Sequence, residues 1–264
     1  MRRQTLSLLA GLLVAAVAQA QGTPPPADAH SRAPVDLTGY WVAVVTEDWR
    51  YRMMTPDRND FTGVALNAAG RAAMQKWDPA KDEASGEACR AYGAGAIMRV
   101  PTRLHISWQD GSTLKIDTDA GEQTRLFHFA APAPATATAS WQGYSVASWE
   151  GLRPRGGGGG GVTARLTTTT GSAAEAAAPT QDGYLKVMTT QVRPGYLRKN
   201  GVPYGAGTSV EEYFDSFREP NGDVWLVVTS IVTDPEFLDQ SFITSSQFKK
   251  TDAAKWSPTP CQAK

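Results

Sequence analysis

The chain has 264 residues, with 26 basic (Lys and Arg) and 26 acidic (Asp and Glu) side chains. This balance argues against nucleic acid as a partner, because nucleic-acid binding depends on clustered Lys and Arg. The length fits one large β domain or two small ones, and it is sufficient to bury a substantial hydrophobic core.

The first twenty residues have the composition of a secretory signal peptide. Met1-Arg2-Arg3 is followed by an apolar run over 6–17 and then by Ala18-Gln19-Ala20. A basic start, an apolar stretch too short to span a bilayer and a small-residue site predict cleavage after Ala20. We therefore expect a periplasmic or secreted protein. It has no later apolar run of membrane-spanning length, so we expect no stable membrane insertion after cleavage. Residues 21–35 are rich in Pro and Ala and are predicted to form a flexible linker.

The chain has two cysteines, Cys89 and Cys261. An even number of cysteines in an exported protein predicts one disulfide, which would hold the C-terminal tail against an early loop. The alternative is a catalytic or metal-binding thiol. No CxxC motif and no histidine at zinc-site spacing accompanies either cysteine.

Strand-like alternation and turn residues dominate from residue 36 onward. Strands are predicted over 40–46, 103–109, 113–119, 123–129, 145–149, 184–192, 210–218, 223–232 and 241–249. Residues 67–76 predict one or two helical turns, whereas 78–87 and 193–207 are expected to be loops. The pattern indicates a single all-β domain over 36–264. We expect a lipocalin-like antiparallel up-and-down barrel, or a strongly curved sheet, with little helix. A low-complexity stretch over about 153–182 is predicted to be a surface insertion.

The turns within 103–129 fix which side chains share a face. The predicted register places Trp108 opposite Leu114, His105 opposite Asp117 and Ile116 opposite Arg125. One face then carries Leu104, Ile106, Trp108, Leu114, Ile116, Phe127 and Phe129 with Arg125 among them. The other face carries His105, Lys115, Asp117, Thr124 and His128. The sequence does not decide which of these faces points inward.

Two resemblances accompany this pattern. Gly39-x-Trp41 at the start of the first strand resembles the lipocalin and calycin signature, in which the Trp packs at one end of a barrel. A wider resemblance connects the chain to a family of uncharacterised secreted bacterial β-rich proteins. It is carried by the segments DLTGYWV, EDWRYRM, WDPAKDEASGEAC, WQGYSVASWEG, VRPGYLRKNGVPY and WLVVTSIVTDPEFLDQSF. Both resemblances imply an exported β-rich protein, and the wider one supplies no catalytic residues.

These observations favour a protein that holds a small hydrophobic or amphipathic molecule in the barrel. Arg125, a cation on an apolar face, could meet an acidic group of such a ligand. The segment containing Tyr196, Arg198 and Tyr204 suits the rim of a pocket, and Trp41 is a further candidate contact.

Two alternatives remain open. An isomerase, cyclase or lyase on the same barrel could use His105 with Asp117, or His128, as an acid–base pair. A structural envelope protein would have a packed interior and no ligand. The three histidines are too sparse to predict a metal site, and no motif predicts a cofactor. The sequence does not specify the ligand or the oligomeric state.

Overall fold

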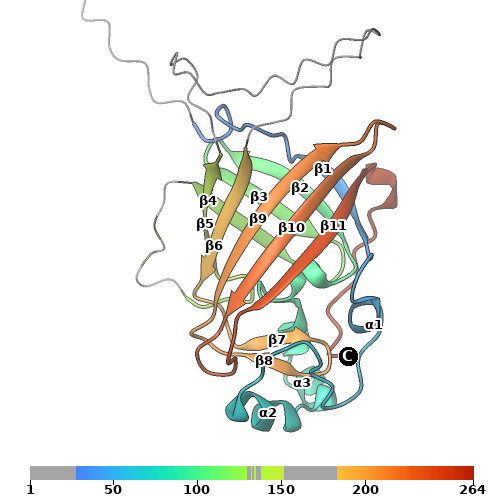
Figure 1. Cartoon of the computed structure of the whole chain (residues 1–264), viewed down its shortest axis with the longest axis vertical. Coiled ribbons are helices and arrows are strands. Elements are labelled where there is room, and N and C mark those ends of the chain that lie inside the picture. Colours follow the sequence, from blue (N-terminus) through green and yellow to red (C-terminus); the bar gives the residue numbers. More distant parts are fainter. Residues whose placement is uncertain (1–27, 130–131, 133, 135–137, 152–182) are drawn as a thin grey trace, which may run out of the picture.

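The computed structural model describes residues 28–129, 132, 134, 138–151 and 183–264. Within these ranges the chain forms a closed antiparallel-type barrel, so the predicted all-β barrel fold is confirmed (Figure 1). Its strands are β1 (Gly39–Val44), β2 (Arg103–Asp110), β3 (Thr113–Thr118), β4 (Thr124–Phe129), β5 (Tyr144–Glu150), β6 (Tyr184–Thr190), β9 (Ser209–Arg218), β10 (Val224–Thr233) and β11 (Phe242–Thr251). Around the barrel they follow the order β1-β11-β10-β9-β6-β5-β4-β3-β2.

The topology departs from a simple up-and-down barrel at two places. β4 and β5 are parallel, with Phe127 opposite Ser145. A parallel pair cannot be joined by a short hairpin turn, so this pair departs from the simple up-and-down order. The second departure is between β6 and β9, which are direct neighbours because β7 and β8 form a separate hairpin. The other neighbouring strands are antiparallel.

The predicted register of β2, β3 and β4 is confirmed. Trp108 lies opposite Leu114, His105 opposite Asp117 and Ile116 opposite Arg125. The apolar face points into the barrel, since its side chains are buried apart from the partly buried Trp108, while His105 and Asp117 on the other face are only partly buried. Arg125 is therefore an interior residue.

One end of the barrel carries almost all of the helical structure, and we call it the helical end (Figure 1). Its elements are α1 (Trp49–Arg52), α2 (Ala68–Gln75), α3 (Pro79–Ala84), the 3₁₀ turns η1 (Ala88–Tyr92) and η2 (Ile97–Arg99), and the hairpin of β7 (Gly195–Arg198) and β8 (Val202–Tyr204). A further 3₁₀ turn, η3 (Ala253–Lys255), follows β11. None of the helices in the described ranges has the length and apolar character needed to cross a membrane.

Two loop predictions at this end are wrong. Residues 78–87 contain α3, because the Asp78 side chain accepts hydrogen bonds from the backbone N–H groups of Ala80 and Lys81, and Pro79 suits the first helical position. Residues 193–207 contain the β7–β8 hairpin. The predicted helical turns of 67–76 are confirmed as α2, which Asn67 caps through its side chain.

The core has two parts. The larger part fills the barrel and includes Trp41, Ile116, Phe127, Phe214 and Phe248. The smaller part lies at the helical end, where residues of α2, β8 and the β10–β11 loop meet, with Met74, Tyr204 and Leu238 among them. This second part gives the helices and the hairpin a fixed position relative to the barrel.

The prediction of a flexible linker over 21–35 is wrong for its described part, residues 28–35. Within its described part, Ala29 and Val35 are buried in the barrel core. The indole of Trp149 donates a hydrogen bond to the Ala29 carbonyl at 2.9 Å, and His30 stacks on Trp108. The predicted signal peptide, the first part of the linker and the whole of the predicted insertion at 153–182 lie outside the described residues.

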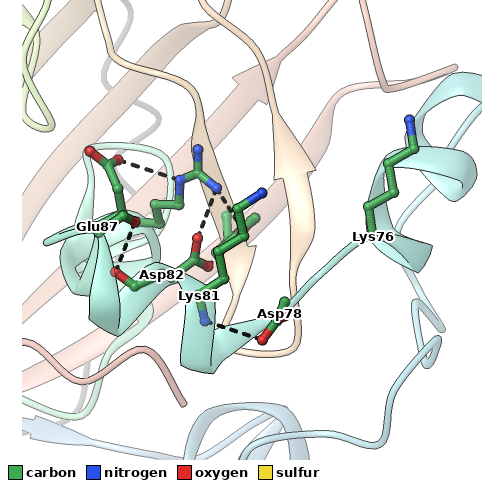
Figure 2. A pocket seen from close by; sticks show the side chains of 8 residues that line it. Lys76, Asp78, Lys81, Asp82 and Glu87 are labelled. Carbon is green, nitrogen blue, oxygen red and sulfur yellow. Dashed lines mark hydrogen bonds and ion pairs between the residues drawn. The ribbon is translucent and has the colours of Figure 1, made fainter.

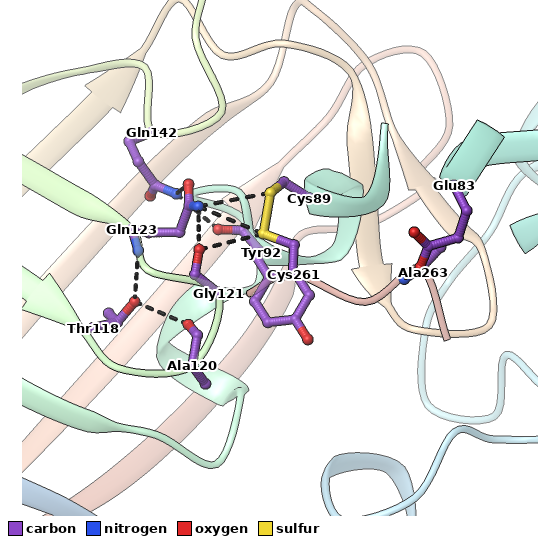
Figure 3. The surroundings of a disulfide bond; sticks show 10 residues. All are labelled: Glu83, Cys89, Tyr92, Thr118, Ala120, Gly121, Gln123, Gln142, Cys261 and Ala263. Atoms are coloured by element: carbon purple, nitrogen blue, oxygen red, sulfur yellow. Dashed lines mark hydrogen bonds between the residues drawn. A yellow bond between two sulfur atoms is a disulfide. The ribbon is translucent and has the colours of Figure 1, made fainter. Parts of the chain in front are cut away.

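Cys89 and Cys261 form the predicted disulfide (Figure 3). It joins the η1 turn to the C-terminal tail across 172 residues of sequence. Gln123 lies over the bridge, and its side-chain amide donates to the Gly121 carbonyl at 2.6 Å. The tail is held further by the backbone N–H of Ala263, which donates to Glu83 of α3. The disulfide thus connects the last residues of the chain to the helical end.

Replacing both cysteines by Ala should lower the free energy of unfolding by about 2–5 kcal/mol, because the bridge restricts the unfolded chain over a long loop. Urea unfolding of the wild type, with and without reductant, and of the double variant measures this difference. Equal midpoints in all three samples would show that the bridge contributes nothing to stability.

Candidate functional site

The interior of the barrel contains a buried ion pair. Arg125 of β4 contacts Glu212 of β9 at 2.6 Å between Nη2 and Oε2 and at 3.1 Å between Nη1 and Oε1. Thr189 of β6 accepts a further hydrogen bond from Arg125, and Ser230 of β10 donates to Glu212. The guanidinium carbon also lies 4.9 Å from the ring centre of Phe127. The pair therefore connects β4 and β9, which are separated in the barrel wall by β5 and β6.

Among the described residues this pair is fully enclosed, since the side chains of Arg125 and Glu212 are both 0% exposed. Apolar side chains above and below them, such as Ile116 and Phe214, are equally inaccessible. Arg125 was expected to meet an acidic group of a ligand. Glu212 of the protein itself supplies that acidic group. A ligand in this part of the barrel would have to displace both groups.

The predicted acid–base residues lie on the outside of the barrel. His105 Nδ1 is 3.9 Å from Asp117 Oδ2, but that oxygen is closer to Lys115 Nζ, at 2.8 Å. The His105 ring stacks on Tyr40 with the ring centres 4.3 Å apart. His128 is separate from this pair. It lies opposite Thr113 and stacks on Tyr144. The structure thus brings His105 and Asp117 together on the outer face, away from the barrel core.

A hollow lies at the helical end, between α2, α3, η1 and the β7–β8 hairpin. A polar pocket of about 270 Å³ is bordered by Lys76, Asp78, Lys81, Asp82, Ser85, Glu87, Arg90 and Tyr196 (Figure 2). A second pocket of about 210 Å³ shares Lys76, Arg90 and Tyr196 with the first. It is otherwise lined mainly by apolar groups: Ala73, Trp77, Pro194, Gly195, Pro203, Tyr204 and Phe237. We call the two pockets together the amphipathic groove.

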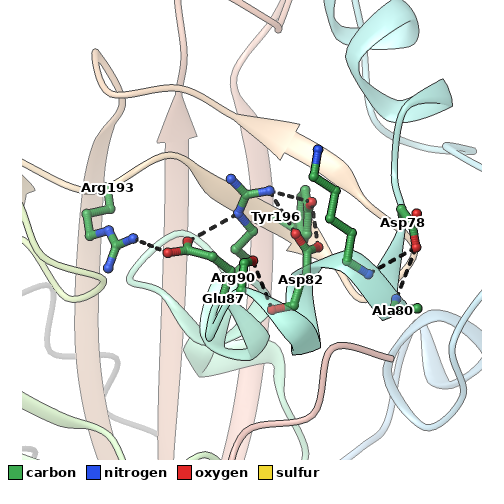
Figure 4. A network of polar contacts seen from close by, with 9 residues as sticks. Asp78, Ala80, Asp82, Glu87, Arg90, Arg193 and Tyr196 are labelled. Carbon is green, nitrogen blue, oxygen red and sulfur yellow. Dashed lines mark hydrogen bonds and ion pairs between the residues drawn. The ribbon is translucent and has the colours of Figure 1, made fainter.

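A hydrogen-bonded network fixes the polar wall of the groove (Figure 4). Asp82 of α3 accepts from the Tyr196 hydroxyl at 2.9 Å and from Arg90 Nη1 at 3.0 Å. Arg90 also donates to the Tyr196 oxygen at 3.0 Å and lies 3.5 Å from Glu87. Arg193 completes the network with a 2.6 Å contact to Glu87. These contacts link α3, η1 and β7, so the groove is preorganised.

Burial raises the pKa of Tyr196 to about 12, and its hydrogen bond to Asp82 acts in the same direction, whereas Arg90 opposes the shift. The phenol is therefore protonated at neutral pH and donates to Asp82. Chemically, Tyr196 is a positioning group with a fixed proton and is not poised to act as a base.

The charged residues that line the groove balance formally, with Lys76, Lys81 and Arg90 against Asp78, Asp82 and Glu87, but the acidic groups are engaged within the protein. Asp82 and Glu87 are paired with Arg90 and Arg193, and Asp78 accepts from two backbone N–H groups of α3. Lys76 and Lys81 are exposed and have no ion-pair partner among the described residues. These two ammonium groups can meet the head of an anionic ligand.

The predicted ligand contacts fall in three different places. Tyr196 and Tyr204 line the amphipathic groove. Trp41 is a core residue whose indole donates to the Leu37 carbonyl. Arg198 lies in another, smaller pocket with Arg52 and Arg99. Sequence reasoning missed Trp77 and Arg90. The Asp78-Pro79 helix start was the available signal that 76–90 is ordered and can form a wall.

Within the described residues, no group of three or more His, Cys, Asp or Glu side chains is arranged to hold a metal ion. No family model, curated protein or solved structure matches the chain. The candidate site is therefore defined by its geometry and chemistry.

Replacing Glu212 by Gln should lower the free energy of unfolding by about 3–5 kcal/mol, because it leaves the Arg125 guanidinium buried without a counter-charge. The double variant Arg125→Met/Glu212→Leu should recover most of this loss, since it removes both buried charges. Urea denaturation of the three proteins tests the pair. A single variant as stable as the wild type would contradict a closed, water-free interior.

The raised pKa of Tyr196 predicts a specific loss of stability in alkali. The folded protein holds this proton more tightly than the unfolded chain, so the stabilisation is complete below pH 10 and is lost as the pH rises toward 12. In Tyr196→Phe, the free energy of unfolding should fall less steeply over that interval. Parallel curves for the two proteins would show that the Tyr196 proton does not contribute.

Proposed function

We propose that this protein is an exported binding protein for small amphipathic molecules with an anionic head, which it holds in the amphipathic groove at the helical end. The observation that carries the proposal is the continuity of the groove. A polar pocket and an aromatic pocket share Lys76, Arg90 and Tyr196, so one molecule can contact both.

The composition of the groove supports this assignment. Small-molecule sites are concave, mostly apolar and supplied with a few fixed polar groups, and they occupy roughly 300–1,000 Å³. The two pockets together reach the lower part of that range. Trp77, Pro203 and Phe237 offer an apolar surface for the body of the ligand. Lys76 and Lys81 provide positive charge for its head.

The packing of the barrel supports a site at its end. The Arg125–Glu212 pair and the buried apolar side chains of the larger core fill the barrel interior, where a lipocalin-like protein would hold its ligand. Binding sites are commonly built on loops that a rigid scaffold positions. The helical end, with its second core and the disulfide, is such a position.

The proposed location outside the cytoplasm is supported by the composition of residues 1–20 and by the Cys89–Cys261 bridge. Disulfides form and persist in oxidising compartments and are rare in the cytosol.

The first test uses 8-anilinonaphthalene-1-sulfonate, a fluorescent aromatic molecule with an anionic head, titrated into the mature protein. We expect saturable binding with one site. Phe237→Ala should weaken it because contact with the apolar body is lost. Lys76→Gln/Lys81→Gln should weaken it by about three- to tenfold because two exposed charge contacts are lost.

Matched controls remove the same groups elsewhere. Phe217 is exposed on β9, and Lys186 lies on the outer surface of β6, so Phe217→Ala and Lys186→Gln should bind the dye as the wild type does. Loss of binding in the controls but not in the groove variants would place the site elsewhere. A folded protein with no saturable binding, and no small molecule retained in native mass spectrometry, would favour the structural role.

A further inference from the structure

Three arginine side chains that are distant in the sequence gather at the helical end. Arg52 belongs to α1, Arg99 to η2 and Arg198 to β7. They are 6%, 6% and 5% exposed, so each is more than nine-tenths buried. Burying like charges together is unfavourable unless an anion or hydrogen-bond acceptors compensate them.

The protein compensates this cluster only in part. Arg99 forms an ion pair with Asp48 at 3.1 Å, and Arg52 Nε donates to the Arg99 carbonyl at 2.9 Å. Both terminal nitrogens of Arg52 are buried and have no hydrogen-bond partner in the described part of the chain. The same is true of Nε and Nη1 of Arg198. The guanidinium groups of Arg52 and Arg198 therefore both have unused N–H donors within this cluster.

Aromatic rings hold these side chains in position. The Arg198 guanidinium lies 4.2 Å from the centre of the Tyr51 ring, and that of Arg99 lies 5.2 Å from the Phe242 ring. Stacking of this kind orients a guanidinium without using its N–H groups. The donors of Arg198 are thus fixed but remain free to bind another group.

The pKa shifts of the arginines agree with a cluster whose positive charge is only partly compensated. Burial lowers the pKa of Arg52 and of Arg198, and the positive charge of Arg99 lowers both further. Glu47, Asp48 and Asp60 act in the opposite direction. A guanidinium stays protonated even so, and the cluster keeps its positive charge.

A small cavity lies beside the cluster. It has a volume of about 30 Å³, and Arg52, Arg99, Arg198, Tyr51 and Lys199 are among the residues that border it. A space of this size admits a water molecule or the oxygen atoms of a small group. The cavity borders the three arginines, and an oxyanion would have to widen it to reach the unpartnered nitrogens of Arg52 and Arg198, which are buried.

We propose that Arg52, Arg99 and Arg198 form an oxyanion-binding site, which takes a phosphate, sulfate or carboxylate group. Planar guanidinium forks match the oxygen atoms of these groups and bind them through paired charge-assisted hydrogen bonds. A bound oxyanion would accept from the free nitrogens of Arg52 and Arg198 and would neutralise the repulsion within the cluster.

This site is distinct from the amphipathic groove and does not depend on the proposed function. β7 contributes Tyr196 to the groove and Arg198 to the arginine cluster. The two sites share this strand but have no lining residue in common.

The test measures binding of inorganic phosphate, sulfate and acetate to the mature protein by calorimetry, together with the melting temperature at constant ionic strength. Near hundredfold saturation, the bound anion should raise the melting temperature of the wild type by about 5–10 °C. Arg52→Gln and Arg198→Lys should each weaken binding by about tenfold or more. Arg198→Lys keeps the charge and removes the planar fork, so it separates recognition geometry from net charge.

Arg218→Gln is the matched control, because Arg218 is exposed at the end of β9 and its guanidinium contacts only a nearby carbonyl among the described residues. Phosphate and sulfate stabilise many proteins without binding to them. An equal rise in melting temperature in the wild type and in both cluster variants would therefore overturn the proposal, as would the absence of calorimetric binding. Unchanged dye binding in Arg198→Lys, with anion binding lost, would show that the cluster acts independently of the groove.

Discussion

The ion pair between Arg125 and Glu212 is the constraint on which the interior of this barrel depends. Both charges are fully buried, and each is compensated by the other and by hydroxyl groups from neighbouring strands. Removing charges from water costs several kcal/mol per ion, so such a pair persists only where its geometry is fixed. Because β4 and β9 lie apart in the barrel wall, the pair determines how these strands face each other. It also fills the space that a ligand would need.

Because the barrel interior is filled, the candidate binding sites lie at the end of the barrel. The helical end is built from the long connections between β1 and β2 and between β6 and β9, which carry their own core and a disulfide. The same connections form the amphipathic groove and the arginine cluster. The barrel then acts as a rigid scaffold, and the chemistry lies in the segments it positions.

Local signals predicted the parts of the fold that depend on neighbouring residues. Short turns and alternating side chains fixed the register of β2 to β4, and that register correctly placed Arg125 among apolar groups. The parallel pairing of β4 and β5 could not be predicted, because the connecting segment has neither a helix pattern nor a short turn. The α3 helix was predictable from Asp78-Pro79, although the polar composition of the segment favoured a loop.

The candidate sites were less accessible to sequence reasoning. Glu212 is 87 residues from Arg125, and only the closed barrel brings the two side chains together. Arg52, Arg99 and Arg198 likewise come from three separate segments, each of which reads as an ordinary polar or basic stretch. Tyr196 and Arg198 were predicted to lie at the rim of one pocket, whereas the hairpin places them beside two different pockets. These sites depend on burial and on contacts between residues that are far apart in the sequence. Neither leaves a local pattern in the sequence.

The claim that the barrel is closed and that binding takes place at its helical end is tested most directly by locating a bound molecule. A crystal structure with a bromonaphthalene sulfonate, examined for the anomalous signal of bromine, gives that position. The account predicts the bromine beside Trp77 and Phe237, with the Arg125–Glu212 pair intact. A bromine signal among Phe127 and Phe214 inside the barrel, with that pair separated, would contradict it.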